Sequence, residues 1–447
     1  MQPEPTPAPD APTAAPRKAV FIVFLVIFID LLGFGIVLPL LPRIADEYLA
    51  PAGVSATLSG FLIGVLFSSF SLMQFVFAPL WGRLSDRAGR RPILLIGLGG
   101  SVVFYTLFGL ASELPPEQAW AALGLLLLSR AGAGVAGATI ATAQAVIADS
   151  TPPHERKRGM ALIGAAFGIG FTFGPLIAYA AVVWFPELRG GVGYVAAALS
   201  LVAFILAVRL LPETRRPGAP SAARRSWLDM HGLYRTLRTP AVGLLVLIFF
   251  LATFAFANFE ATLALLTKAF GYTDDDNFLI FAYVGALLMV AQGVVYRRLA
   301  KRLDEVSFVR IGLAIIFIGL ANLAGVAVVT TGTMPGDWHL TWFLLTLACA
   351  VFGFAFLTPS VQALISRRTA ADRQGEVLGV NQSFAALARI LGPLIGLTLF
   401  GSTETHMLPY VFAAALLAVV LLLVPRIGRE EAEPGPEGNG KNGFEEG

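Results

Sequence analysis

Apolar residues form long segments along the chain, and most polar residues collect in the short stretches between them. Each apolar segment has about 20 residues or more, which is the length that a helix needs to cross the hydrocarbon core of a bilayer. A backbone surrounded by lipid must satisfy its own hydrogen bonds, so each segment is predicted to be helical. The predicted spans are 19–41, 56–79, 92–112, 118–147, 159–185, 192–212, 241–268, 277–297, 306–330, 338–365, 376–400 and 407–425.

The composition agrees with lipid as the main solvent of the chain. Of the 447 residues, 56% are hydrophobic and 14% are charged, whereas soluble domains carry about 25% charged residues. The mean hydropathy is +0.74. The single cysteine, Cys349, excludes an intramolecular disulfide. We expect neither a cofactor nor a metal site.

Basic residues alternate between the two sides of the predicted membrane region. The tails and every second loop hold 25 of the 32 lysines and arginines. Because basic loops stay in the cytoplasm, both termini are predicted to be cytoplasmic and the number of spans to be even. We expect a multi-pass protein of a bacterial inner membrane.

The two halves of the chain resemble each other at a fixed offset of 218 residues. The segment QAVIADST at 144–151 aligns with QALISRRT at 362–369, and GPLI occurs at both 174–177 and 392–395. Such repeats are typical of transporters whose site lies between the halves. The predicted fold is an all-α membrane protein of 12 transmembrane helices in two pseudo-symmetric six-helix bundles. The predicted parts are a disordered tail 1–17, bundles 18–212 and 241–426, a cytoplasmic linker 213–240 and a disordered tail 427–447.

A glycine pattern in the fourth span imitates a dinucleotide-binding loop. Gly132, Gly134 and Gly137 have the G-x-G-x-x-G spacing, but apolar sequence continues on both sides of them. A phosphate-binding loop needs a preceding strand and an open helix N-terminus, and a segment within lipid offers neither. We therefore interpret the small residues as a helix-packing face. That face consists of Ala133, Gly137, Ala141 and Ala145.

Four charged residues lie inside predicted spans, where a charge costs about 2.5–3.5 kcal/mol. They are Asp30, Arg130, Glu260 and Arg389. Charges in such places mark ion or substrate pathways, so we take these residues as candidates for proton coupling, with pairing across a central cavity. The alternative is that they form ion pairs that hold helices together. Candidate substrate contacts, which could instead be helix–helix hydrogen bonds, are Gln74, Gln144, Asn258, Gln362, Asn381 and Gln382.

Two further motifs suggest a conformational change. A predicted loop after the second span contains Gly82, Asp86, Arg87, Gly89, Arg90 and Arg91. Asp86 could cap a helix N-terminus, and the arginines could pair with Asp149, although a basic loop also serves as a positive-inside anchor. In the fifth span, Gly170, Gly174 and Pro175 allow close helix packing and a bend, which suits rocking of one half against the other or ordinary packing.

These motifs together resemble the major facilitator superfamily, and within it the drug:proton antiporter class that includes the tetracycline efflux proteins. Residues 82–91 match the signature G-x-x-x-D-R-x-G-R-R, and the segment FIDLLGFGIVLPLLP is similar to the first helix of the tetracycline exporters. The resemblance places Asp30 at the acidic position of that helix and links Arg130 to proton transfer. Gly170, Gly174 and Pro175 resemble the antiporter motif, which continues here with Ala178 and Tyr179 in place of two glycines.

The expected function is secondary active transport by alternating access, with export of amphipathic small molecules or drugs in exchange for protons. One alternative is a facilitator or a proton symporter of a polar metabolite. Another is a membrane receptor or lipid-handling protein that does not transport. We expect no enzyme, because the sequence contains no HExxH, GxSxG or phosphate-loop motif. The expected partners are a small-molecule substrate, protons and the lipid bilayer, with no nucleic acid, and the protein is expected to be a monomer.

Overall fold

The computed structural model describes residues 15–150, 156–214, 230–330, 337–369 and 373–423, and the described residues contain helices and no strand. Most residues of the two predicted tails, and residues 215–229 of the predicted linker, lie outside these ranges. The α-helices are α1 (Ala15–Val37), α2 (Leu41–Leu49), α3 (Ala56–Ala88), α4 (Arg90–Glu113), α5 (Ala119–Ala136), α6 (Ile140–Ser150), α7 (Arg156–Trp184), α8 (Gly191–Leu210), α9 (Met230–Arg238), α10 (Pro240–Ala269), α11 (Asp274–Val290), α12 (Arg297–Leu299), α13 (Glu305–Thr330), α14 (Asp337–Arg367), α15 (Gln374–Phe400) and α16 (Leu408–Leu423).

The long helices match the predicted spans. Within the described residues, ten helical segments are long and apolar enough to cross a membrane, and two shorter apolar helices, Gly168–Trp184 and Leu408–Leu422, accompany them. Each of the predicted spans overlaps one of these segments, which confirms the all-helical membrane fold.

The structure differs from the predicted spans where the backbone deviates from a regular α-helix. The first span breaks at residues 38–40 around Pro39, which has no amide hydrogen, and then continues as α2. The 3₁₀-helix η2 (Gly137–Thr139) interrupts the fourth span. The π-helix η3 (Ala291–Tyr296) interrupts the eighth span. The predicted linker contains α9, which is too short and too polar to have been recognised as a span.

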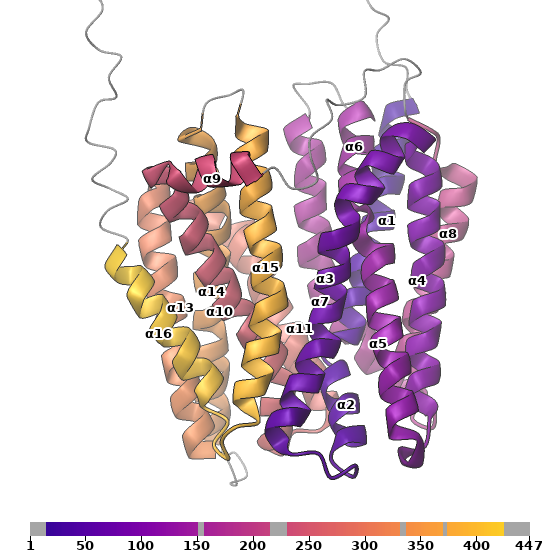
Figure 1. The fold of residues 1–447 in the computed structure, drawn as a ribbon, viewed down its shortest axis with the longest axis vertical. Helices are drawn as coiled ribbons and strands as arrows, with labels where there is room; N and C mark the ends of the chain where they lie inside the picture. Colours follow the sequence, from indigo (N-terminus) through magenta and orange to yellow (C-terminus); the bar gives the residue numbers. More distant parts are fainter. Residues whose placement is uncertain (1–14, 151–155, 215–229, 331–336, 370–372, 424–447) are drawn as a thin grey trace, which may run out of the picture.

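Figure 1 shows the helices side by side, with those of the two halves of the chain on different sides of the picture. In the N-terminal half α1 packs on α7, and α4 packs on α5 and α8. In the C-terminal half α13 packs on α14, and α10 packs on α15 and α16. The halves meet where α3 contacts α15 and α7 contacts α11. We call the end of the bundle with α2 the α2 end, and the end with α9 the α9 end.

The halves touch closely toward the α2 end. A Cβ atom at Gly64 of α3 would stand 2.9 Å from the Cα atom of Leu394 on α15. A Cβ atom at Gly285 of α11 would collide with the carbonyl oxygen of Phe171 on α7. Farther toward the α9 end, α3 leans away from α15 (Figure 1). There, among the described residues, nothing lies within 4 Å of a Cβ atom built at Gly82, Gly168, Gly293 or Gly379. The structure is therefore closed at the α2 end.

Filling the contact at Gly64 should prevent this closure. Overpacking of this kind costs about 1–3 kcal/mol, so Gly64→Leu should raise the fraction of molecules open at the α2 end roughly tenfold. The measurement is the labelling rate of Ser59→Cys, a position that is buried in the closed arrangement, by a membrane-impermeant thiol reagent in a Cys349→Ala background. Gly124→Leu, at an exposed site with open space around it, is the control. Equal labelling in both variants would contradict the closed assignment.

Candidate functional site

Arg130 is an enclosed charge of the N-terminal half. It lies on α5 and is 1% exposed. Its guanidinium carbon is 4.7 Å from the ring centre of Phe70 on α3 and 5.7 Å from that of Phe34 on α1. Aromatic faces attract a cation, yet its Nε and Nη1 atoms have no hydrogen-bond partner within the described chain. Asp30 lies one helical turn before Phe34 on α1, and its side chain is outside the described residues.

Glu260 and Arg389 form the charged pair of the C-terminal half. Glu260 lies on α10 and is partly buried, and Arg389 lies on α15 and is exposed. Their opposite charges influence each other at a distance, without a direct hydrogen bond or ion pair between these two described side chains. Close packing brings their helices together, since a Cβ atom at Gly392 of α15 would stand 2.9 Å from Cβ of Ala257 on α10. Both residues therefore lie in the C-terminal half, on helices that pack against each other.

The candidate amide side chains fall into two groups. Gln144 and Gln382 are exposed, Gln74 and Gln362 are partly buried, and Asn258 and Asn381 are fully buried. Gln74 Nε2 donates to the carbonyl oxygen of Gly137 at 3.2 Å. Asn258 Nδ2 donates to the carbonyl oxygen of Pro409 at 3.1 Å. Asn258 thus joins α10 to α16, whereas the four glutamines are exposed or partly buried.

The predicted loop Gly82–Arg91 is almost entirely helical, which corrects the sequence interpretation. Helix α3 extends through Gly82, Asp86 and Arg87 to Ala88, and α4 begins at Arg90. Gly89 alone separates the helices, with a φ angle of 108° that side-chain-bearing residues rarely adopt. A sharp reversal at one glycine therefore replaces a loop.

Arg90 and Glu213 organise this reversal. Arg90 forms ion pairs with Asp86 and with Asp149 at the end of α6, the latter at 3.3 Å between Nε and Oδ2. The predicted pairing with Asp149 is confirmed. Glu213, which follows α8, accepts the backbone N–H groups of Arg90 at 2.9 Å and Arg91 at 3.1 Å. Glu213 and not Asp86 therefore caps the start of α4.

The glycines of the fifth span form a close seam with the first span. A Cβ atom at Gly170 of α7 would stand 3.0 Å from Cβ of Leu31 on α1, and one at Gly174 would stand 2.8 Å from the carbonyl carbon of Gly35. Pro175 lies inside α7, which continues through it to Trp184. The seam joins α1 to α7 within the N-terminal half.

Comparisons with known proteins identify the family of the chain. The sequence model of the Major Facilitator Superfamily matches residues 23–393 and 320–446. The chain belongs to the major facilitator superfamily. It is 31% identical over 416 residues to the tetracycline resistance protein, class E, of Escherichia coli, with 92% of this chain and 95% of the relative covered. It is 32% identical over 391 residues to the class D protein of Salmonella ordonez, with 87% and 91% covered.

Solved structures of superfamily transporters have the same fold. The human organic anion transporter MFSD10 (TETRAN) is 25% identical to this chain, with a TM-score of 0.60 and 92% of this chain and 99% of that chain covered. The D-xylose-proton symporter has a TM-score of 0.74 at 16% identity, with 91% and 97% covered, and this likeness shows the fold alone. As a superfamily member, the chain is a multi-pass integral membrane protein and a secondary transporter of small molecules.

A residue that binds the signature segment 82–91 from elsewhere in the chain was not predicted from the sequence. Glu213 is separated from Arg90 by 123 residues, and neither local periodicity nor the motif connects them. The available signal was a carboxylate placed directly after the sixth span, at the same end of the bundle as the predicted loop.

Proposed function

We propose that this transporter exports amphipathic small molecules in exchange for protons. The observation that supports the proposal best is the placement of Glu260 and Arg389, a carboxylate and a guanidinium, on the packed helices α10 and α15 inside apolar spans. A carboxyl group in such a place changes its proton affinity when its surroundings change. In the proposal, Asp30 and Glu260 take up and release the proton, while Arg130 and Arg389 modulate them.

Alternating access is supported by the difference between the two ends. The halves are in close contact toward the α2 end, and α3 leans away from α15 toward the α9 end (Figure 1). In the proposed cycle the substrate enters from the α9 end, contacts the glutamines Gln74, Gln144, Gln362 and Gln382, and leaves at the α2 end. We further propose that the α9 end and both termini face the cytoplasm of a bacterial cell, that the protein resides in the inner membrane, and that it acts as a monomer.

Two specific observations bear on the substrate class. Four relatives at 28–32% identity are tetracycline resistance proteins, which favours drug export. Arg130 and Arg389 lie inside spans, and the human structure compared above is an organic anion transporter. These facts favour amphipathic organic anions as the second candidate class.

The test is transport by purified protein in proteoliposomes with an imposed pH gradient. Tetracycline and carboxyfluorescein serve as the drug and organic-anion probes, and protein-free liposomes as the control. Export predicts that the probe moves opposite to the protons, and that reversing the gradient reverses its flux. Asp30→Asn should lose the gradient-driven part. Movement of the probe together with protons would identify a symporter, and binding without flux a receptor.

A further inference from the structure

A short helix ends the first span at the α2 end. After the break at residues 38–40 the chain forms α2, which carries Arg43 and Asp46 one turn apart. Asn277 of α11 donates its side-chain N–H to the carbonyl oxygen of Pro39 in this break, at 3.0 Å. The start of α2 is thereby fixed to the C-terminal half of the chain.

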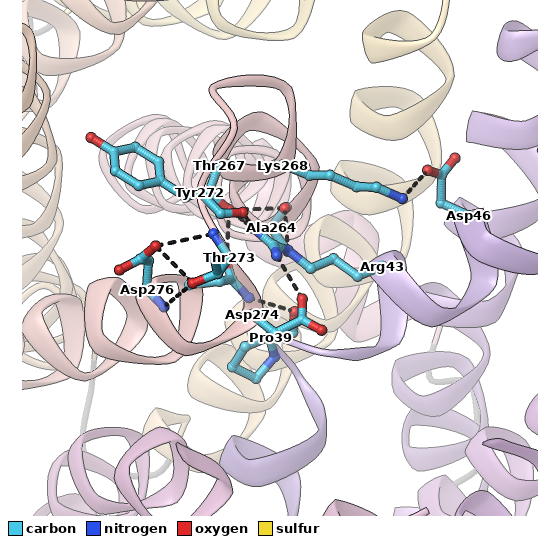
Figure 2. Close-up of polar contacts among 11 residues, drawn as sticks. Pro39, Arg43, Asp46, Ala264, Thr267, Lys268, Tyr272, Thr273, Asp274 and Asp276 are labelled. Atoms are coloured by element: carbon cyan, nitrogen blue, oxygen red, sulfur yellow. Dashed lines mark hydrogen bonds and ion pairs between the residues drawn. The ribbon is translucent and has the colours of Figure 1, made fainter. Parts of the chain in front are cut away.

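Arg43 is 4% exposed, and its side-chain hydrogen bonds and ion pair reach the opposite half, at the corner where α10 leads into α11 (Figure 2). Nη1 lies 2.6 Å from Oδ1 of Asp274. Nε and Nη2 donate at 3.0–3.1 Å to the carbonyl oxygens of Ala264 and Tyr272 and to the hydroxyl of Thr267. One carboxylate and three neutral acceptors thus compensate a guanidinium that would be costly to bury without partners.

A second ion pair crosses the same boundary with the opposite polarity. Lys268 at the end of α10 lies 2.7 Å from Asp46 of α2. The N-terminal half therefore contributes a cation and then an anion, and the corner of the C-terminal half contributes the complementary anion and cation. A shift of α2 that placed Arg43 opposite Lys268 would bring like charges together, so this arrangement allows a single docked register.

The hydrogen bonds join these contacts into one network. The hydroxyl of Thr267, which accepts from Arg43, lies 2.7 Å from Oδ1 of Asn277, and Asn277 in turn holds Pro39. The Asp46–Lys268 pair borders a cavity of about 480 Å³ between the halves and is partly exposed. Exposed pairs contribute about 0–1 kcal/mol, so Arg43 is expected to dominate the network.

We propose that α2 is a latch whose Arg43 holds the transporter closed at the α2 end and must leave Asp274 in every transport cycle. The proposal rests on the alternating access proposed above and adds the residue that positions the closed state. In this proposal the Arg43–Asp274 pair stabilises the closed state more than the Asp46–Lys268 pair does. Removal of Asp274 would leave Arg43 buried with neutral acceptors alone, so the end would open to hydrate it. Removal of Lys268 would leave an exposed carboxylate and cost little.

Distances between spin labels test the latch without substrate or protons. In a Cys349→Ala background, labels at the exposed positions Glu117 and Glu404 report on the α2 end, and labels at Arg83 and Arg298 report on the α9 end. Double electron–electron resonance in nanodiscs should show the open-at-α2 population rising about fivefold or more in Arg43→Gln and Asp274→Asn. The α9-end distance should shorten at the same time.

The control variant is Arg189→Gln. Arg189 pairs with Glu47 of α2 at 3.1 Å, at the same end but within the N-terminal half. This variant and Lys268→Gln should keep the parental distances. If Arg43→Gln and Asp274→Asn both kept the spin-label distances and the melting temperature of the parent protein, the latch proposal would be wrong. Shifted distances in a protein that fails to exchange protons for substrate would support the latch and refute the proposed function, so the two failures are distinguishable.

A cross-link provides the opposite perturbation. Asp46→Cys with Lys268→Cys, joined by a short bifunctional thiol reagent, should stop transport of tetracycline because the latch can no longer open. The matched pair Glu47→Cys with Arg189→Cys, joined in the same way, should leave transport running because it does not cross the halves. Unchanged transport in the first cross-linked protein would overturn the proposal.

Discussion

Replacing Arg130 with methionine should abolish proton-driven transport while leaving the protein at least as stable as the parent. The guanidinium is 1% exposed, and two of its nitrogen atoms lack hydrogen-bond partners in the described part of the chain. A buried charge without full compensation is costly, so replacing it with an apolar side chain of similar length should not lower the free energy of unfolding. A loss of transport with unchanged or higher stability identifies a functional charge. Thermal unfolding in detergent and flux in proteoliposomes provide the two measurements.

Two variants make the Arg130 result specific. Arg209→Met removes an exposed arginine of α8 and should leave both measurements unchanged. Arg130→Lys keeps the charge but not the planar group that stacks on Phe34 and Phe70, so it should retain part of the flux. If Arg130→Met lowered the melting temperature in proportion to the flux, the residue would be structural.

Replacing Glu260 with glutamine should separate substrate movement from proton movement. The amide has nearly the shape of the carboxyl group but cannot carry a proton. Gradient-driven transport should fall at least about tenfold, equivalent to about 1.4 kcal/mol, while exchange of labelled for unlabelled substrate should stay close to the parental rate. The measurements are net flux under a pH gradient and equilibrium exchange in the same proteoliposomes.

Arg389 provides the control for Glu260, because the two side chains interact. Arg389→Gln leaves the carboxylate without its cation and should lower stability, whereas the double variant Glu260→Gln with Arg389→Gln should recover the stability but not the gradient-driven flux. Parental net flux in Glu260→Gln would remove this residue from the proposed coupling.

Much of the fold could be predicted because a span in lipid is specified by its own residues. Length and apolar composition located every membrane helix, and backbone hydrogen bonding required helices. The parts of the fold that were predicted wrongly depend on single residues or on contacts between distant segments. Pro39 ends α1 early, Gly89 turns a predicted loop into a reversal between two helices, and α9 is too polar for the length criterion.

The charged residues of the candidate site could be predicted from the sequence, but the residues that they contact could not. Glu260 and Arg389 stand out because they interrupt apolar spans. Their mutual interaction, the capping by Glu213 and the burial of Arg43 arise between segments more than 100 residues apart. Arg43 follows the first predicted span directly, and the local sequence does not indicate which distant segment will cover it. Tertiary packing decides those contacts.

The carboxylate of Glu213 has a mechanical consequence for the N-terminal half. By accepting two amide hydrogens at the beginning of α4, it ties the segment that leaves the sixth span to the third span. Arg91 strengthens this connection by donating to the carbonyl oxygen of Val208 at 2.6 Å. The third and sixth spans are thereby joined next to the reversal at Gly89, so we expect a displacement of the chain after α8 to be transmitted to the start of α4.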